Sequence, residues 1–336
     1  MPLPSVLAFG EALCDRLGPM GADFSSNKGI EDCIGGAPAN VVCALARLGI
    51  DVGFCGRIGK DDIGNKINQL MTSRGVNITC LQEDQKRPTR IVLVKRDIHG
   101  ERSFEGFHGD EAIGFADQHI NLEDLKASWG LISQNLNWLV IGSIPLASDE
   151  SSESLIWLVE KACESGIKIA IDINWRAKFW DVNSMPNSGP DNHIVNIVLR
   201  ILSKVSLIKL SNEEANWFFK TYNPSQISKL FNQAPDVVIT NGSKPIKWNI
   251  ANFVGEKKIY NQSKVIDTTG AGDAFTAGLI YSFLNTSYNN LSAEKVTDMI
   301  SFASAAGALV CQGAGAIDPQ PTKSEIYKYI QNYSGL

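Results

Sequence analysis

The residues best suited to chemistry form one short run late in the chain, Asp267-Thr-Thr-Gly-Ala-Gly-Asp273, which leads directly into Ala274-Phe-Thr-Ala-Gly278. Gly270 and Gly272 let backbone N–H groups converge on one point, and the start of a helix adds partial positive charge there. This arrangement predicts a site for a phosphoryl group. Asp273 would lie in the first helical turn, where a lone aspartate is ordinarily a helix cap. Beside a phosphate it could instead accept the proton of an alcohol that attacks phosphorus.

A second glycine-rich run, Gly35-Gly-Ala-Pro-Ala-Asn40, lies near the front of the chain. Two glycines followed by a proline at the start of a helix would expose backbone amides to a polar ligand. The side chain of Asn40 can both donate and accept hydrogen bonds. The alternative is a turn that binds nothing. Neither run is a Walker loop, and the nearest candidate, 53–60, has the wrong glycine spacing and is followed by Asp61 where Ser or Thr is needed.

Alternating strand and helix patterns predict the elements that would position these runs. Short apolar segments are typical of buried strands, and we predict strands at Ser5–Gly10, Val52–Arg57, Asn137–Ile144, Ile167–Asn174, Val205–Ser211 and Val237–Thr240. Apolar residues at helical spacing predict helices at Pro38–Leu48, Asp61–Arg74, Ser151–Glu164, Ile194–Leu202, Glu213–Phe219, Gly270–Asn285 and Ser292–Cys311. The alternation favours an α/β fold in which helices cover both faces of a mostly parallel central sheet.

Two segments break this alternation. Residues near 11–34 show no helical pattern, and residues near 78–108 contain two strand-like stretches, Thr89–Arg96 and Arg102–Phe107, around a His99-Gly100 turn. Both segments would leave the same edge of the sheet, so we expect a small β-strand lid over a cleft. No repeat or low-complexity linker divides the chain, and residues 1–336 are predicted to form a single domain that carries this lid.

Composition excludes several classes of protein. The chain has 336 residues and a formal net charge of −5, whereas nucleic-acid-binding proteins usually carry a basic excess. No segment approaches the roughly 18 apolar residues of a membrane span, and the first residues do not resemble a signal peptide. The seven cysteines contain no C-x-x-C pair, which favours reduced thiols. The four histidines (His99, His108, His119 and His193) lack the spacing of zinc ligands. A cytoplasmic protein without nucleic-acid or membrane partners is expected.

Together, the two glycine-rich runs resemble the signatures of the ribokinase-like (PfkB) carbohydrate kinase family. Gly35-Gly36-Ala37 with Asn40 resembles the front signature, and 267–273 matches the rear one without a break. The resemblance covers roughly residues 5–321 and is greatest to the fructokinase branch, on Gly10-Glu-Ala-Leu-Cys-Asp15, Ala44-Leu-Ala-Arg-Leu-Gly49, Arg57-Ile-Gly-Lys-Asp-Asp-Ile-Gly64, Asp172-Ile-Asn-Trp-Arg176 and Gly315-Ala-Ile317. It implies a ribokinase-like three-layer sandwich and ATP-dependent phosphorylation of a sugar hydroxyl, with fructose to fructose 6-phosphate as the expected reaction.

The resemblance also implies roles for individual residues. Asp273 would be the general base, Arg176 would lie close to the phosphates, and the transferring phosphoryl group would be held by the amides of Gly270, Ala271 and Gly272. The sugar would be bound by Glu11, Asp15, Gly35, Gly36, Ala37, Asn40, Arg102, His108 and Asp273. ATP would be bound by Asn174, Arg176, Lys209, Glu214, Thr240, Gly242, Gly270, Gly272, Ser304 and Gly315, with Mg²⁺ held through water by Glu214. Asp267 and Thr269 match positions that help to bind a monovalent cation in relatives, and their oxygen atoms suit potassium.

Several positions depart from the family pattern. Ser211 stands where many members have Asn, and Pro245 replaces a second glycine of the nucleotide loop. In the lid, Gly106 and His108 stand where close relatives have an aromatic residue and an arginine. Because lid residues help to select the sugar, a kinase for a nucleoside or for another sugar or sugar acid, such as 2-keto-3-deoxygluconate, is an alternative. A catalytically silent sugar-binding or regulatory protein is another. A dinucleotide-binding oxidoreductase is disfavoured, because the first strand does not lead into a G-x-G-x-x-G turn.

Two further expectations concern contacts with other molecules. The helix 292–311 is rich in small residues, which let another helix or a flat ligand such as adenine approach closely. A lid made of strands has open edges, and pairing of two lids in a homodimer would cover them. The expected partners are therefore a sugar, ATP and a second copy of the chain.

Overall fold

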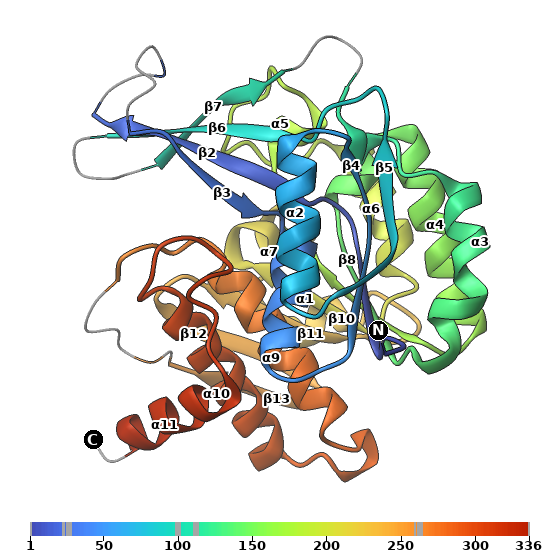
Figure 1. Ribbon diagram of the computed structural model, residues 1–336. Helices are drawn as coiled ribbons and strands as arrows, with labels where there is room; N and C mark the ends of the chain where they lie inside the picture. Colours follow the sequence, from blue (N-terminus) through green and yellow to red (C-terminus); the bar gives the residue numbers. More distant parts are fainter. Residues whose placement is uncertain are drawn as a thin grey trace.

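The computed structural model describes residues 2–21, 24, 29–97, 102–109, 114–258, 260 and 265–334. Their dominant element is a nine-stranded sheet (Figure 1), which contains, in spatial order, β13 (Phe253–Lys257), β12 (Lys244–Ile250), β11 (Asp236–Asn241), β10 (Leu207–Ser211), β9 (Lys168–Asp172), β8 (Trp138–Gly142), β1 (Val6–Phe9), β4 (Val52–Gly59) and β5 (Asn77–Asp84). Neighbours from β11 to β5 pair in parallel, whereas β12 pairs antiparallel with both β11 and β13. The predicted mostly parallel sheet is confirmed.

Helices cover both faces of this sheet because its central strands are apolar on both sides. In β1, Val6 and Ala8 join one buried cluster while Leu7 and Phe9 join another, as the two-residue period of a strand requires. The first cluster is covered by α1 (Ala37–Arg47), α2 (Asp62–Ser73), α9 (Ala271–Leu284), α10 (Ala293–Val310) and α11 (Lys323–Ser334). The second is covered by α3 (Leu122–Ile132), α4 (Asp149–Glu164), α5 (Ala177–Trp180), α6 (Asn192–Leu202), α7 (Asn212–Phe219) and α8 (Pro224–Ser228). Among the described residues, no helix is both long and apolar enough to cross a membrane.

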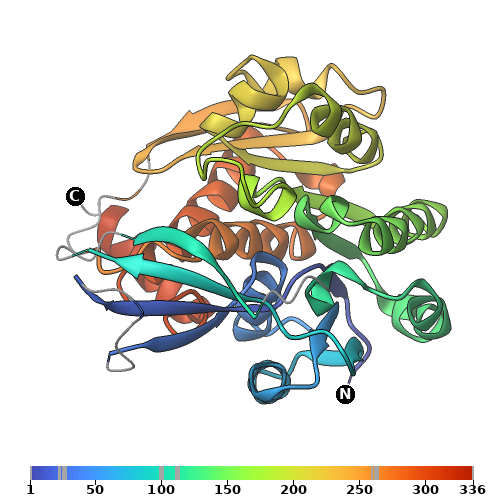
Figure 2. The same ribbon diagram turned by 90° about the horizontal axis from the view of Figure 1, so that it is seen from above.

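A second, four-stranded sheet has the order β3 (Glu31–Gly35), β2 (Leu13–Met20), β6 (Ile91–Arg96) and β7 (Arg102–His108). The β2–β6 pair is parallel and the other two pairs are antiparallel. This small sheet follows the carboxyl ends of β1 and β5 after short connections, and Figures 1 and 2 both show it on the side of the molecule away from α3 and α4. The β excursions predicted near 11–34 and 89–107 are therefore confirmed over the described residues, while the His99-Gly100 turn lies outside them.

The lower bound predicted for the second excursion is wrong. Residues 77–84 form β5, which pairs in parallel with β4 at the edge of the large sheet. An edge strand has a neighbouring strand on one side only. For this reason β5 is mostly half-exposed and lacks the continuous apolar run of a central strand. The hairpin β12–β13 was not predicted either, and its two strands extend the other edge. The other predicted strands and helices begin and end within two residues of the observed ones.

Small residues in α9 and α10 let these two helices pack closely. A Cβ added at Gly278 would lie 2.9 Å from Cα of Ala303, and one at Gly307 would lie 2.8 Å from the carbonyl oxygen of Ala271. The small-residue pattern of α10 therefore serves helix packing along most of its length.

A buried carboxyl group, Asp236, lies at the start of β11, away from the cavities described below. Its Oδ1 accepts hydrogen bonds from the backbone N–H of Ala251 (2.8 Å) and from the hydroxyl of Tyr288 (3.0 Å). Burial nevertheless raises its pKa from 3.8 to about 6, because it disfavours the charged form more than these donors favour it.

We expect Asp236→Asn to stabilise the protein at neutral pH. The pKa of Asp236 is higher in the folded protein than in the unfolded one, so the uncharged carboxyl group favours the folded state. This contribution to stability is complete below about pH 4 and is lost as the pH rises through about 6. Asparagine keeps an acceptor oxygen and does not ionise, so the gain in free energy of unfolding should be about 1–2 kcal/mol at pH 7.5 and absent at pH 4. Thermal melts across this pH range test it, with the exposed Asp51→Asn as the control. A gain that does not depend on pH would contradict the assignment.

Candidate active site

A cavity of about 880 Å³ lies between the carboxyl edge of the large sheet and the small sheet. Its floor consists of the segments that follow β1, β9 and β10 and the first turns of α1 and α9, which is where open parallel sheets bind ligands. Among the predicted site residues, the cavity brings together Glu11, Asp15, Gly36, Ala37, Asn40, Asn174, Arg176, Lys209, Glu214, Thr269, Gly270, Gly272 and Asp273.

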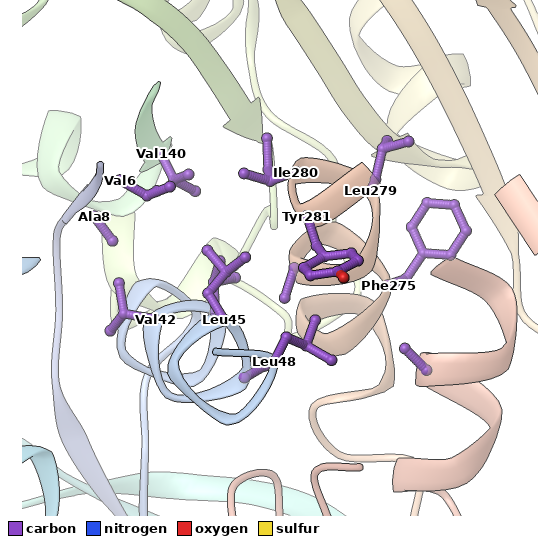
Figure 3. Packing of buried hydrophobic residues seen from close by; sticks show 14 of the residues in the cluster. Val6, Ala8, Val42, Leu45, Leu48, Val140, Phe275, Leu279, Ile280 and Tyr281 are labelled. Carbon is purple, nitrogen blue, oxygen red and sulfur yellow. The ribbon is translucent and has the colours of Figure 1, made fainter. Parts of the chain in front are cut away.

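The packing of α1 against α9 brings the two glycine-rich runs together. Figure 3 shows side chains of both helices in one apolar cluster with β1 and β8, and its labelled members are Val6, Ala8, Val42, Leu45, Leu48, Val140, Phe275, Leu279, Ile280 and Tyr281. Both helices begin at the same edge of the sheet, and there Nδ2 of Asn40 donates a hydrogen bond of 2.7 Å to Oδ2 of Asp273. These two residues are 233 positions apart in the sequence.

Asp273 has the electrostatic environment of a general base. Burial raises its pKa from 3.8 to about 6, and the charge of Asp172 acts in the same direction. The hydrogen bond from Asn40 and the positive charges of Lys209 and Arg176 oppose this rise. At neutral pH the carboxylate is therefore mostly ionised and still basic enough to accept a proton from a hydroxyl group.

The turn before α9 requires glycine at position 270. Gly270 has a φ of 77° and is the residue before the helix, and a Cβ there would lie 2.5 Å from the Cβ of Ala316. The first turn of α9 then points N–H groups without intrahelical acceptors at the cavity. The N–H of Ala271 already donates to the carbonyl oxygen of Thr268 at 3.2 Å, so anion binding falls mainly to the neighbouring amides.

A buried cation lies directly beneath this turn. Nζ of Lys209, on β10, donates to Oδ2 of Asp172 at 2.8 Å, and that oxygen also accepts from the hydroxyl of Thr276 on α9. A Cβ added at Gly272 would lie 3.0 Å from the same Nζ. Burial lowers the pKa of Lys209, but the surrounding carboxylates more than offset this and hold it above its ordinary value, so the ammonium stays charged.

Glu214 connects the segment after β9 to the start of α7. One carboxylate oxygen accepts the N–H of Trp175 (2.6 Å) and the other accepts the N–H of Ser211 (2.6 Å). The hydroxyl of Ser211 caps the helix in return, so the departure from Asn at this position preserves a capping box. Burial and the charge of Asp172 raise the pKa of Glu214, while Lys209 lowers it. By holding Trp175, Glu214 fixes the position of Arg176, which lines the cavity.

Glu11 contributes a second kind of carboxyl group. It is 3% exposed, its Oε1 accepts the N–H of Ala37 at 3.1 Å, and its Oε2 has no hydrogen-bond partner among the described residues. Burial raises its pKa to about 8, so at neutral pH it is mostly a neutral acid with one O–H to donate. Gly36 passes so close that a Cβ there would lie 2.5 Å from the carbonyl oxygen of Glu11, at a φ of 105°.

A second cavity, of about 600 Å³, lies on the other side of the 268–272 turn and shares Thr268 and Gly272 with the first. Besides Gly272, it contains three of the predicted nucleotide-binding residues, Thr240, Gly242 and Ser304. The predicted Gly315 does not line it, and its N–H donates to Oδ2 of Asp267 at 2.8 Å. Pro245 lies in β12 beside an irregularity in the β11–β12 pairing, where a missing N–H is tolerated.

The small sheet contributes the predicted Asp15, on β2, to the lining of the cavity. It also contributes Val92, Ser103 and Phe104, which were not predicted. His108 instead lines a separate cavity of about 470 Å³, so its predicted contact with the sugar is not supported. His108 is the last residue of β7 and pairs with Ile91 at the end of the β6–β7 ladder, which places it in this other cavity. Gly35 lies behind the cavity wall, where a Cβ would be 3.4 Å from Oδ2 of Asp15, and the side chain of Arg102 lies outside the described part of the chain.

Asp267 has a structural function in the turn. Its Oδ1 accepts the N–H (3.0 Å) and the hydroxyl (2.7 Å) of Thr269, and its Oδ2 accepts the N–H of Gly315. In the described ranges, no three His, Cys, Asp or Glu side chains form a group that could hold a metal ion by themselves. A cation at this place would need carbonyl, hydroxyl or phosphate oxygens in addition.

Sequence reasoning missed several residues of the site. Asp172 and Thr276 complete the charge network around Lys209, and Leu13, Trp175 and Phe179 line the cavity. A signal was present for Asp172, because it begins the Asp-x-Asn-x-Arg run whose arginine was predicted to contact phosphate. The apolar residues carried no such signal, because their types are those of any core position.

A buried carboxylate at the start of a helix, between a polar cavity and a second cavity, is the arrangement expected of a phosphotransferase that acts on an alcohol. The sequence matches the pfkB family carbohydrate kinases over residues 4–323, and the chain belongs to that family.

Individual relatives agree with this assignment. The chain is 32% identical to a fructokinase of Vibrio alginolyticus, over 89% of this chain and 92% of that one. A fructokinase of Xylella fastidiosa, solved with bound ATP, superposes with a TM-score of 0.80 at 25% identity, covering 99% and 100% of the two chains. A fructokinase of Vibrio cholerae O395, solved with fructose, ADP and calcium ion, superposes with a TM-score of 0.78 at 28% identity, covering 98% and 100%. The ribokinase-like fold predicted from the sequence is confirmed.

The hydrogen bond between Asn40 and Asp273 gives a testable pH dependence. The bond lowers the pKa of Asp273, so Asn40→Ala should raise it. The acidic limb of the profile of kcat/KM against pH should then move up from about 6 by roughly half a pH unit to one unit. Steady-state rates between pH 5 and 8 measure this, with the exposed Asn65→Ala on α2 as the control. An acidic limb that stays in place would contradict the assignment of that limb to Asp273.

Proposed function

We propose that this protein transfers the γ-phosphoryl group of ATP to a hydroxyl group of a sugar, and that the sugar is fructose, which becomes fructose 6-phosphate. The observation that carries the proposal is the position of Asp273. Its carboxylate lies at the start of α9, hydrogen-bonded to Asn40, where a polar cavity and a second cavity share the turn 268–272. At that point a hydroxyl group in one cavity and a terminal phosphate in the other can meet beside the same carboxylate.

The residues of the larger cavity suit a sugar. Asp15 and Asn40 offer acceptors and donors, and Glu11, as a neutral acid, offers an additional donor. A site with such fixed partners rejects molecules that lack the matching hydroxyl groups, because the buried polar groups would then be left unpaired. The oxygen atom of the sugar hydroxyl attacks the γ-phosphorus, its proton passes to Asp273, and the bond to the bridging oxygen breaks to release ADP.

Positively charged groups and backbone amides where the two cavities meet suit the phosphates of ATP. The amides at the start of α9, the guanidinium of Arg176 and the ammonium of Lys209 surround the place where negative charge develops. Such preorganised charges are worth more in a buried site than in water. The adenosine part would occupy the smaller cavity, between Thr240 and Gly242 on one side and Ser304 on the other.

Mg²⁺ fits the acidic side of this site. Glu214 lines the cavity and uses one lone pair of each oxygen on a backbone amide, which leaves lone pairs for a water molecule in the shell of the ion. When bound with ATP, Mg²⁺ neutralises part of the phosphate charge. Potassium at Asp267 and Thr269 stays a prediction, and comparison of rates in potassium and sodium salts tests it.

Fructose is favoured by the relatives. Several family members similar to this chain are named fructokinases, and the fructokinase of Vibrio cholerae was solved with fructose bound. The wall formed by Val92, Ser103 and Phe104 offers a sugar acid no described positive charge, which disfavours 2-keto-3-deoxygluconate.

A panel of sugars tests the substrate. With ATP and Mg²⁺, release of ADP in a coupled assay should be fastest with fructose, and slower by tenfold or more with glucose, ribose, 2-keto-3-deoxygluconate and nucleosides. Asp273→Asn should lower kcat by about 10³-fold or more while calorimetric ATP binding stays within about twofold. Activity confined to a non-ketose would overturn the choice of fructose. Sugar and ATP binding without turnover would favour a silent binding protein.

The homodimer also stays a proposal. The outer strands of the small sheet, β3 and β7, are edge strands, and β3 begins with two exposed residues. Pairing of two such edges would satisfy their backbone groups. Light scattering measures the mass directly, and a monomer at high protein concentration would overturn the proposal. The cytoplasmic location likewise stays a prediction from the sequence.

A further inference from the structure

Arg90 is a buried arginine that the reaction described above does not use. It lies just before β6, and its guanidinium makes a two-point ion pair with Asp117, with Nε–Oδ2 at 2.8 Å and Nη2–Oδ1 at 2.9 Å. The side chains of Arg90 and Asp117 are 4% and 3% exposed. A buried pair of this kind is costly to desolvate and is weak evidence for a role in stability alone.

Three phenylalanine rings enclose the same guanidinium. Its Cζ lies 4.9 Å from the ring centre of Phe107, 4.5 Å from that of Phe115 and 4.8 Å from that of Phe179. Phe107 also contacts the other two rings, with centroid distances of 5.6 Å to Phe115 and 5.2 Å to Phe179. A planar guanidinium can stack on several rings and still hold a carboxylate by two bonds, whereas the compact ammonium of lysine cannot.

Two of these rings, Phe107 and Phe179, come from segments that form walls of the cavity. Phe107 belongs to β7 of the small sheet and contacts Phe104, which lines the cavity, at 5.1 Å. Phe179 belongs to α5, lines the cavity itself, and donates its N–H to the carbonyl oxygen of Arg176 at 3.0 Å. On the other side of the guanidinium, the negative charge of Asp117 acts on Glu11 at the sugar end of the cavity.

We propose that Arg90 is a positioning residue for the sugar-binding half of the site. It holds the small sheet against the segment of Arg176 and Phe179. The distance between the two walls, and hence the fit of the sugar between Phe104 and the floor of the cavity, is set by this cluster of Arg90, Asp117, Phe107, Phe115 and Phe179. The inference deepens the proposed function and rests on it for the identity of the ligand.

Arg90→Lys tests this role because it keeps the charge opposite Asp117 and removes the planar fork. We expect the KM for the sugar to rise tenfold or more, while the KM for ATP stays within twofold. We also expect more ADP to be released per sugar phosphate formed, because a loosely held wall admits water as a competing nucleophile. The calorimetric Kd for fructose without ATP should rise in parallel.

Phe107→Leu is the second variant, for the case that Arg90→Lys fails to fold. It leaves the ion pair intact and replaces a residue that does not itself line the cavity, so it should fold and still raise the sugar KM and Kd. When both substitutions are combined, the effect on the sugar Kd should be smaller than the product of the two single effects, because both break the same contact.

Arg16→Lys is the matched control. Arg16 also makes a two-point pair in the small sheet, with Asp32 at 2.7 Å and 2.9 Å, but it is partly exposed and touches none of the three rings. Its substitution should leave the KM and Kd for the sugar unchanged.

The calorimetric reading separates the two proposals. A wild-type protein that binds fructose without phosphorylating it would overturn the proposed function, and the Kd values of the variants would still decide the role of Arg90. Unchanged sugar Kd and KM in Arg90→Lys and Phe107→Leu, together with lower melting temperatures, would overturn the positioning role and leave Arg90 as a purely structural residue.

Discussion

Burial of one ammonium group among carboxylates is the constraint on which the site depends. Lys209 pairs with Asp172, and the charges of Glu214 and Asp273 act on it as well. Removing any of these carboxylates from water is costly, and the burial appears as a raised pKa at both Asp273 and Glu214. The charge of Lys209 lowers the pKa of Asp273, so without this cation the pKa of Asp273 would be higher still. The buried ammonium therefore favours the charged form of the carboxyl group at the start of α9.

The backbone around this cluster is fixed by close approach. Gly270 and Gly36 adopt conformations that favour glycine and lie against other parts of the chain, at Ala316 and Glu11. Both precede a helix whose first turn lines the cavity. Each signature therefore has a glycine where the chain enters a helix and a Cβ atom would clash with a neighbouring segment. The side chains that line the cavity, Asn40 and Asp273, follow in the first turn of each helix.

Conversely, the cavity is enclosed by contacts that join elements distant in the sequence. The wall opposite Asp273 belongs to the small sheet, and the cluster around Arg90 connects that sheet to the segment of Arg176. Prediction from the sequence identified the lid strands but placed His108 in the sugar site, because a resemblance carries position along the chain and not the direction in which a strand presents its side chains. Val92, Ser103 and Phe104 line the cavity in its place.

The sequence by itself determined the alternating α/β fold, the family, and the glycine-rich turn at 267–273 that places Asp273 in the first turn of a helix, because these depend on local patterns: apolar periodicity, glycine before a helix, and an acid in the first turn. Only the tertiary structure decided that β5 belongs to the large sheet and that Asn40 forms a hydrogen bond with Asp273. It also decided that Asp172 pairs with Lys209 and that the N–H of Gly315 donates to Asp267. Those contacts join residues far apart in the chain, and they exist only because the helices α1 and α9 and the ends of parallel strands meet at one edge of the sheet. Burial at that edge, which no local pattern encodes, sets the pKa of each acid and hence its function.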